Sequence, residues 1–356
     1  MVRTLAAALL AGGAILLSAA CGGAAAGGSA STSGSAGSQG AAGGKLITAR
    51  LAHNLPAQQH VGLGMQHFAD LVNERGAGKI RIDVYSAGQL FSDLDMPNAI
   101  SSGAVEMGMT TTSTWGGLSP INDLWSIPFL FEDNDHVYRS LDSGLNDLMQ
   151  EERAKLNDKV LIWVQYSGVG SGGYASNVPL TSPEAWQGKR VRCIGALGCK
   201  LVELAGGSPV NLGGAEVEEA LQRGTIDASV SGFTSFVSRH YYEFTKYVMP
   251  TNVLGYGMFD LSVNLDWYNS LPDDVRQIID QAAAESQQWI RDLEVQETQK
   301  ALQELQDKGM QLVQQPESEQ ERFKKIRDQL IQEDFLPHTG DLGQRALDVV
   351  EKERQS

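Results

Sequence analysis

The sequence predicts an α/β protein built from two similar lobes. Three observations lead to this prediction. A strand, a helix and a second strand follow one another early in the main body, one short pattern occurs twice, and a helix near the C-terminus is long enough to lie across both lobes. The chain has 356 residues, of which 42% are hydrophobic, so it can bury two cores of ordinary domain size.

The strand–helix–strand unit covers residues 46–86. It opens with an apolar run at residues 46–52, which predicts a short strand. An amphipathic helix comes next, with an apolar face made by Val61, Met65, Phe68, Ala69 and Val72. Gly76 ends this helix, and residues 79–86 then alternate between apolar and polar side chains as a half-buried strand does. This order is typical of a βαβ unit and therefore indicates a largely parallel sheet.

The repeated pattern lies at residues 99–106 and 220–227. Each copy reads Ala, an aliphatic residue, two variable positions, Gly, one further position, an aliphatic residue and an acid. Gly103 and Gly224 are expected to cap a helix, and a strand is expected to follow each of them. Two lobes of similar build would enclose a cleft, which is where ligands usually bind.

The long helix is predicted from residue 273 to residue 308. Ser270 starts a capping pair with Asp273, and neither Gly nor Pro interrupts the apolar periodicity before Gly309. At about 1.5 Å per residue, such a helix can reach across two lobes. The alternative is two shorter helices with a kink near Glu294. Further surface helices are predicted at residues 317–335 and 341–353.

The charge balance excludes two classes of partner. The chain carries 28 basic and 43 acidic residues, a formal net charge of −15. Nucleic acids and anionic lipid surfaces are bound through clustered Lys and Arg, which an acidic chain without a basic run does not offer. Any bound anion must therefore be held by a local positive group.

The N-terminus predicts export. Arg3 precedes an apolar run at residues 5–17, and small residues follow, so residues 1–20 are interpreted as a signal peptide. The apolar run is too short to span a membrane permanently.

Cys21 directly after the small residues resembles a lipoprotein processing site. That motif usually has Leu three positions before the Cys, where this chain has Ser18. Residues 21–44 are then a Gly/Ala/Ser tether after a lipidated Cys21, because they lack side chains that could form a core. Plain secretion with an incidental cysteine is the alternative.

Two cysteines, Cys193 and Cys199, remain in the main body. Outside the cytoplasm a disulfide between them is allowed, and two reduced, partly buried thiols are the alternative. No further ligands are evident near them for a metal ion, and no cofactor is expected.

Eight short motifs carry a resemblance to a known family. The chain resembles the extracytoplasmic solute receptors of the tripartite ATP-independent periplasmic (TRAP) transporters, in the dicarboxylate-binding-protein-like group, from about residue 46 to residue 336. The motifs are FADLV at 68–72, GKI at 78–80, GQL at 88–90, IPFLF at 127–131, GKRVR at 188–192, EVEEALQRG at 216–224, YEFTKY at 242–247 and LPDDV at 271–275.

The resemblance implies a two-lobe, periplasmic-binding-protein-like (type II) fold with crossing strands as hinges and a long helix packed across both lobes. Lobe I would comprise residues 45–168 and about 253–294, and lobe II residues 169–252 and about 295–356. It also implies closure on a small organic acid and delivery of that acid to membrane permease subunits driven by an ion gradient.

Arg192 is the main candidate for holding the ligand, because the resemblance places the family's carboxylate-binding arginine at this strand end. A guanidinium meets a carboxylate through two parallel hydrogen bonds and stays charged when it is desolvated. A surface arginine paired with an acidic neighbour is the alternative interpretation. Arg190 is expected to be a solvated companion.

The resemblance places four further candidates on loops or strand ends around the cleft: Asn54, Asp93, Thr111 and Trp115. Thr111 belongs to a run of hydroxyl side chains that could bind the ligand but could also satisfy local backbone groups. Trp115 could cover an organic ligand or could pack inside a lobe. Tyr174 and Phe233 are expected to shape the wall of the pocket.

Two departures from the family pattern bear on the ligand. Many relatives have Asn where this chain has Ser231, and some carry a second arginine where this chain has Gly and Ser at residues 170–173. With one strong cation, a ligand with one carboxylate and a polar or aromatic remainder is favoured, such as a keto or hydroxy acid, because an unpaired buried carboxylate is costly.

Three other functions compete with this interpretation. A receptor for an ATP-driven importer, or a sensor, would share the lobes and the cleft. An exported enzyme is disfavoured because the sequence has neither a G-x-S-x-G elbow nor an H-E-x-x-H metal motif. A structural surface lipoprotein would show no closure on a ligand.

Overall fold

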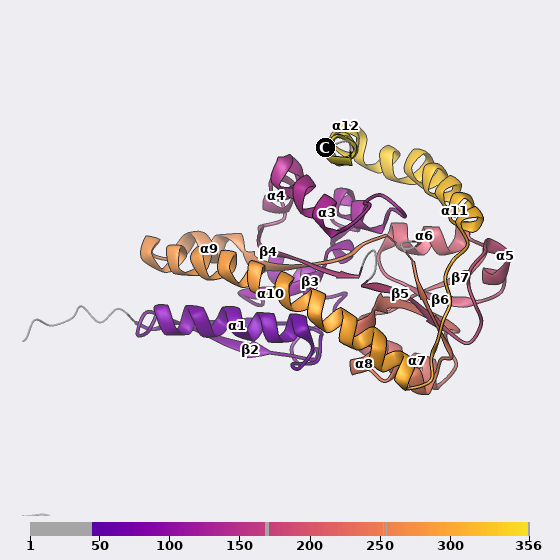
Figure 1. Cartoon of the computed structure of the whole chain (residues 1–356). Coiled ribbons are helices and arrows are strands. Elements are labelled where there is room, and N and C mark those ends of the chain that lie inside the picture. Colours follow the sequence, from indigo (N-terminus) through magenta and orange to yellow (C-terminus); the bar gives the residue numbers. More distant parts are fainter. Residues whose placement is uncertain (1–44, 168–170, 252, 254, 355–356) are drawn as a thin grey trace, which may run out of the picture. The chain divides into compact units, whose positions relative to one another are not determined.

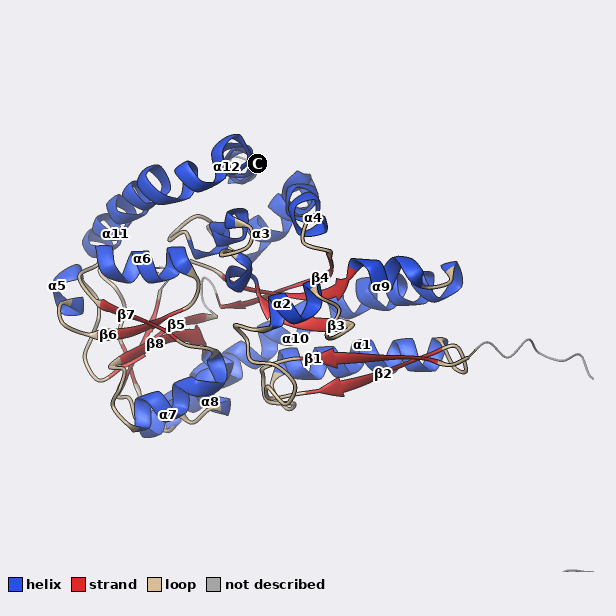
Figure 2. Cartoon of the chain, turned by 180° about the vertical axis from the view of Figure 1, so that it is seen from behind, coloured by secondary structure: helices blue, strands red, loops and turns tan. Residues whose placement is uncertain are grey.

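The structure is a computed structural model that describes residues 45–167, 171–251, 253 and 255–354. The predicted signal peptide, Cys21 and the tether lie outside these residues. The described chain forms one compact unit with two sheets (Figures 1 and 2).

The first sheet is mixed. Its strands, in spatial order, are β2 (Ile80–Tyr85), β1 (Ile47–Ala52), β3 (Met107–Thr111), β10 (Gly257–Asn264) and β4 (Asp158–Ser167). β1 is parallel to β2 and β3, whereas β10 is antiparallel to β3 and β4. Helix α1 (His60–Arg75) connects β1 with β2, and Val61, Met65, Phe68, Ala69 and Val72 are all buried on it. The predicted βαβ unit is therefore confirmed.

The second sheet has six strands. In spatial order they are β11 (Gln311–Leu312), β9 (Tyr247–Pro250), β5 (Gly172–Ser176), β8 (Ala228–Gly232), β6 (Arg190–Cys193) and β7 (Ser208–Asn211). β6 is parallel to β7 and β8, and β5 is antiparallel to β8 and β9. The carboxyl ends of β6 and β8 therefore lie at the same edge of this sheet.

The repeated sequence pattern corresponds to a repeated structural unit. Helix α2 (Met96–Ser101) leads through Gly103 into β3, and helix α7 (Val217–Gln222) leads through Gly224 into β8. Gly103 has φ of 73° and Gly224 has φ of 62°, a left-handed conformation that favours glycine. Each strand that follows has one parallel and one antiparallel neighbour. The predicted helix end, cap and strand are confirmed in both copies.

The chain passes between the two sheets where β4 leads to β5 and where β9 leads to β10. β4 and β10 are antiparallel neighbours, and the last residue of β4, Ser167, pairs with the first residue of β10, Gly257. A Cβ atom on Gly257 would lie 2.1 Å from Oγ of Ser167, so a larger residue there would require the Ser167 hydroxyl to move. β4 and β10, which we call the crossing strands, thus run side by side where the chain passes between the sheets.

Helix α10 (Asp273–Asp307) is a single helix of 35 residues, so the kinked alternative is not what forms. It packs on α1 and β4 of the first sheet and on α8 (Phe233–Ser238) of the second (Figure 1). It ends before Gly309, whose φ of 91° stops the helix as predicted.

The C-terminal segment, which the lobe division expected from the sequence put in lobe II, contacts elements from both expected lobes. Helix α11 (Glu317–Leu330) contacts α6 (Ala196–Leu204). Helix α12 (Leu336–Arg354) instead packs on η2 (Pro120–Ser126) and α3 (Asn134–Ser140), which precede β4 in the sequence. Phe335, Ala346 and Val350 share a core there with Ile121 and Val137. The apolar face of α12 covers this core.

The remaining elements are short: η1 (Thr112–Trp115), η3 (Leu141–Leu145), α4 (Asn146–Ala154), α5 (Pro183–Trp186), η4 (Gly214–Glu216), η5 (Tyr241–Glu243), α9 (Leu265–Ser270) and η6 (Ile331–Phe335). Within the described ranges, no helix combines the length and the apolar character needed to cross a lipid bilayer.

A buried charged cluster underlies the first sheet. Arg153 at the end of α4 donates from Nε to Asp158 at 2.7 Å and from Nη2 to Asp260 at 2.7 Å. All three side chains are fully buried, and the guanidinium carbon lies 3.6 Å from the ring centroid of Trp115. Burial raises the pKa of Asp158 to about 7, while Arg153 opposes that shift. The pair of carboxyl groups therefore depends on one arginine for its counter-charge.

Candidate ligand-binding site

A small cavity opens where the two sheets meet the crossing strands. It borders the carboxyl ends of β1 and β3 in the first sheet and of β6 and β8 in the second, together with the adjacent ends of β4 and β10. Its volume is about 70 Å³, which corresponds to roughly five water-sized groups. Ligands of open α/β sheets bind at such strand ends. The polar residues that line it are Asn54, Asp93, Thr111, Ser113, Ser126, Tyr166, Ser167, Arg192, Ser231, Ser235, Arg239 and Tyr256.

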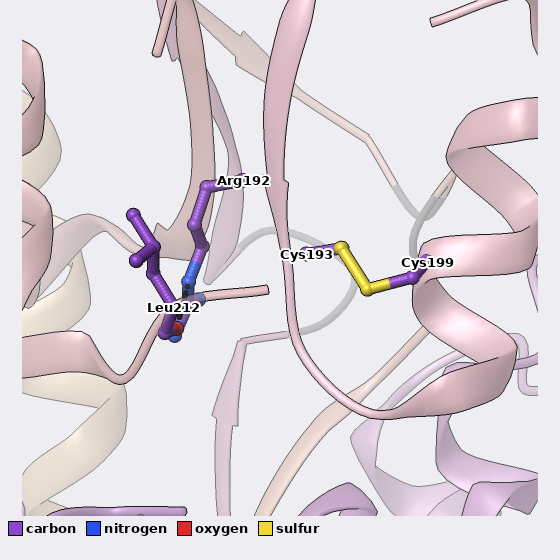
Figure 3. The surroundings of a disulfide bond; sticks show 4 residues. All are labelled: Arg192, Cys193, Cys199 and Leu212. Carbon is purple, nitrogen blue, oxygen red and sulfur yellow. Dashed lines mark hydrogen bonds between the residues drawn. A yellow bond between two sulfur atoms is a disulfide. The ribbon is translucent and has the colours of Figure 1, made fainter. Parts of the chain in front are cut away.

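Arg192 reaches the cavity from the end of β6. Its neighbour Arg190 is exposed and pairs with Asp227 at 2.8 Å, whereas Arg192 is only 7% exposed. Nε of Arg192 donates to the carbonyl of Leu212 at 3.0 Å (Figure 3). Nη1 donates to the carbonyl of Val230 at 3.0 Å. Neither bond uses Nη2. The arginine is thus held by neutral backbone groups, and no carboxylate neutralises it through these bonds.

Burial lowers the pKa of Arg192 from its ordinary value, and Tyr241 and Asp93 partly offset this effect. An arginine nonetheless stays protonated at neutral pH, because its ordinary pKa lies above 12. A buried, charged guanidinium favours an anionic partner.

A disulfide joins Cys193, the residue after Arg192, to Cys199 in the first turns of α6 (Figure 3). The sequence left open whether these thiols are bonded. Ile194 and Gly198 of the enclosed loop also line the cavity. Gly195 has φ of 75°, and a Cβ atom there would lie 2.7 Å from the carbonyl oxygen of Ser113. The bridge therefore closes the loop that forms one wall of the cavity.

Arg239 brings a second guanidinium into the cavity, so the expectation of a single cation is wrong. Arg239 follows α8, is 7% exposed, and donates from Nη2 to the carbonyl of Asn54 at 3.0 Å. The loop at residues 170–173, where some relatives carry an arginine, is not its source. The number of cations on the wall therefore does not by itself select a ligand with one carboxylate.

Asp93 is the acidic residue of the cavity wall. It lies before α2, is 3% exposed and accepts hydrogen bonds from Oγ1 of Thr111 at 3.0 and 3.1 Å. Burial raises the pKa of Asp93, and Arg192, Thr111 and Arg239 oppose that shift. The carboxyl group is therefore placed among positive groups and donors that stabilise its charged form.

Tyr166 and Ser231 complete the polar wall near the crossing strands. The Tyr166 hydroxyl lies 3.2 Å from Oγ of Ser231 and also donates to Oγ of Ser235. Burial raises the pKa of Tyr166 to about 12, so its hydroxyl is neutral at physiological pH. These hydroxyl groups can turn to donate or to accept, so they suit a polar ligand of either kind.

Five of the eight residues proposed from the sequence line this cavity: Asn54, Asp93, Thr111, Arg192 and Ser231. The other three are buried elsewhere. Trp115 covers the Arg153 guanidinium and donates from Nε1 to Thr110 at 2.8 Å. Tyr174 packs edge-on against Trp186 with 4.9 Å between ring centroids. Phe233 and Phe236, both on α8, pack with each other in the core. Their large apolar rings are used to fill the lobe cores.

Sequence reasoning missed Arg239, Tyr166, Ser235 and Tyr256 as lining residues. Arg239 stands at the C-terminal end of a six-residue helix, and no motif marks that position. Tyr166 sits in the apolar run of β4, where an aromatic residue predicts core packing. Their placement depends on how the crossing strands bring the two sheets together.

Two sheets joined by crossing strands, with a cationic cavity between strand ends, define a two-lobe ligand-binding receptor. Residues 51–337 match the family described as bacterial extracellular solute-binding protein, family 7, and the chain belongs to this family. It is an extracytoplasmic solute receptor of the TRAP type.

Relatives of known designation are similar over most of their length. The C4-dicarboxylate-binding periplasmic protein DctP of Rhodobacter capsulatus is 25% identical over 268 residues, which cover 74% of this chain and 78% of that protein. The 2,3-diketo-L-gulonate-binding periplasmic protein YiaO of Escherichia coli is 24% identical over 257 residues, covering 72% and 76%.

Solved structures share the fold at low identity. A marine metagenome TRAP solute-binding protein in complex with pyroglutamate superposes with a TM-score of 0.81 at 21% identity, covering 86% of this chain and 99% of that one. The sugar acid binding protein DctPAm of Advenella mimigardefordensis, in complex with galactonate, gives a TM-score of 0.81 at 20% identity, covering 87% and 99%. At this identity the likeness establishes the two-lobe fold.

Proposed function

We propose that this receptor captures a small organic acid in the cavity at Arg192 and delivers it to the membrane permease subunits of a TRAP-type secondary transporter. The observation that carries the proposal is the buried Arg192 guanidinium, which neutral carbonyl groups hold at the cavity wall. Desolvated arginine strongly favours a carboxylate partner, because two of its N–H groups match the two carboxylate oxygens.

Arg239 supports the same proposal, because it adds a second buried positive group in a chain whose net charge is −15. The names of the relatives support it too, since two of them designate binding of dicarboxylates or of a sugar acid derivative. We further propose that the protein releases its cargo unchanged, because its family consists of binding receptors.

A thermal-shift screen of the purified mature protein tests this function. Small mono- and dicarboxylates, hydroxy acids and sugar acids are each added at millimolar concentration. An acid at a hundredfold excess over its dissociation constant should stabilise the fold by about 2.7 kcal/mol and raise the melting temperature by roughly 5 °C. Neutral sugars and amines serve as controls. If only neutral solutes raise the melting temperature, the carboxylate function is wrong.

We also propose that the receptor is anchored to the membrane by a lipid on Cys21, after removal of residues 1–20. The sequence supports this through the small residues before Cys21 and the Gly/Ala/Ser composition of residues 22–44, which suits a tether. The tether would leave the two lobes free to meet a permease.

Replacing Cys21 with serine should release the protein from the membrane. In a bacterial host that processes lipoproteins, the wild-type protein should sediment with membranes after a high-salt wash, and the variant should appear in the soluble extracytoplasmic fraction or remain unprocessed. A Ser29→Ala variant in the tether keeps the cysteine and the residues before it and is the matched control, which should stay with the membrane. Soluble wild-type protein would contradict the anchor.

A further inference from the structure

The cavity contains hydrogen-bond acceptors as well as cations. A carboxylate ligand supplies acceptors only, so it can satisfy the two arginines but not an acceptor on the wall. Two such acceptors are available, one on Asn54 and one on Asp93, and both side chains are 3% exposed. Buried acceptors require donors, because an unmet buried polar group is costly.

Asn54 is fixed in place beside Arg239. Its backbone carbonyl accepts the 3.0 Å hydrogen bond from Nη2 of Arg239. Its side-chain Oδ1 is buried and has no hydrogen-bond partner among the described residues. A Cβ atom on Gly214 would lie 3.4 Å from Nδ2 of Asn54, so the backbone at Gly214 lies near this amide. Oδ1 of Asn54 is thus a buried acceptor on the cavity wall that a donor on the ligand can satisfy.

Asp93 restricts the kind of ligand group that can bind next to it more than Asn54 does. Rotation of the Asn54 amide would exchange its acceptor for a donor, whereas an ionised carboxylate can only accept. Thr111 donates to Asp93 from Oγ1 and, at 3.4 Å, from its backbone nitrogen. A carboxylate has about four lone-pair sites, so Asp93 can accept another hydrogen bond.

The charges of the wall point to a ligand with a single negative charge. Among the described residues that line the cavity, the side chains that can carry a formal charge are Arg192, Arg239 and Asp93, so the wall has a formal charge of +1 when Asp93 is ionised. One carboxylate balances that charge. A second carboxylate would leave an excess negative charge in a buried space, where like charges repel strongly.

We propose that the cargo is a monocarboxylic acid that also carries a hydroxyl or N–H donor, and that Asp93, assisted by Asn54, accepts a hydrogen bond from this donor. The inference rests on the proposed function, since it assumes that Arg192 and Arg239 hold a carboxylate. Asp93 then determines specificity: it selects hydroxy acids, sugar acids or lactam acids against plain dicarboxylates. Arg192 provides affinity for any of them.

Isothermal titration calorimetry with matched pairs of acids tests the inference on the wild-type protein. One pair is pyroglutamate and its lactone analogue, in which oxygen replaces the ring N–H. A second pair is galactonate and its 2-deoxy analogue, and succinate and glutarate represent plain dicarboxylates. The acid that binds most tightly should carry a hydroxyl or N–H donor. Within the pair to which it belongs, the acid with the donor should bind at least tenfold more strongly than the analogue without it.

An Asp93→Asn variant adds a second readout. It should weaken the tightest donor-bearing acid by about ten- to a hundredfold and should strengthen binding of succinate or glutarate, because the repelling charge is gone. Asp95→Asn is the matched control, since Asp95 is exposed two residues further along the same segment. It should leave both affinities unchanged.

The outcomes separate this inference from the proposed function. If a plain dicarboxylate binds most tightly, or if Asp93→Asn leaves the discrimination unaltered, the inference is overturned while organic-acid capture stands. If no acid of any class binds, both are overturned. Selective binding of a donor-bearing acid that weakens in Asp93→Asn supports both.

Discussion

An Arg192→Ala variant should lose detectable binding of the acid that the wild-type receptor captures. Truncating one partner of a buried, hydrogen-bonded charge pair costs about 2–5 kcal/mol, which corresponds to a loss in affinity of roughly 30- to 4,000-fold. Arg192 lies at the cavity wall with 7% of its surface exposed, whereas Arg239 is held separately by its hydrogen bond to the carbonyl of Asn54 at 3.0 Å. Calorimetric titration measures the effect directly.

Arg190→Ala is the matched control, because Arg190 is two residues away on β6 but exposed and paired with Asp227. It should bind the acid as the wild-type protein does. Arg192→Lys keeps the charge and loses the planar fork of donors, so its affinity should fall between those of the wild-type protein and Arg192→Ala. An Arg192→Ala variant that is folded and binds with unaltered affinity would refute the assignment of the carboxylate site.

An Arg153→Met variant should lose about 3–5 kcal/mol of stability, the largest effect on the fold that we expect from one substitution. Removing Arg153 leaves Asp158 and Asp260 fully buried without their counter-charge. It also removes a guanidinium that lies 3.6 Å from the centre of the Trp115 ring. The melting temperature should fall by on the order of 10 °C, measured by circular dichroism.

The pH dependence of that loss identifies its cause. Burial already raises the pKa of Asp158 to about 7, and removing Arg153 raises it further. A folded-state pKa above the unfolded value near 3.9 contributes stability at low pH that is lost as pH rises through the folded pKa. The deficit of the variant should therefore be smaller at pH 5 than at pH 8.

A surface pair provides the comparison for Arg153. Arg81 pairs with Asp83 on β2 with 62% of its side chain exposed, so Arg81→Met should change stability by less than about 1 kcal/mol at either pH. A deficit in Arg153→Met that does not depend on pH would show that lost packing, rather than an uncompensated carboxylate, causes the destabilisation.

The secondary structure of this chain could be predicted well where apolar spacing and glycine caps coincide. The helix predicted at 273–308 is α10 (Asp273–Asp307), and the strand predicted at 79–86 is β2 (Ile80–Tyr85). Both copies of the repeated pattern form a helix end, a left-handed glycine and a strand. Such signals are local, because periodicity and backbone preference act within a few residues.

The candidate site could be predicted only in part. Arg192 was found from a family motif together with the chemistry of guanidinium, and four neighbours came with it. Arg239 and Tyr166 were missed, since each acquires its position from the packing of β4 and α8 rather than from its own sequence surroundings. Trp115, Tyr174 and Phe233 were assigned to the ligand but pack in the lobe cores, because the sequence does not say which face a large aromatic residue will take.

By itself, the sequence determined the class of this protein, several of its helices and strands, and the arginine on which acid capture would depend. Only the tertiary structure decided which residues meet around that arginine: a second arginine from the end of α8, an aspartate from the segment before α2, and an asparagine after β1 whose Oδ1 has no partner among the described residues. The physical reason is the range of the forces involved. Backbone conformation follows neighbouring residues, whereas the charge and hydrogen bonding of a buried cavity are set by side chains that lie as many as 185 positions apart in the chain.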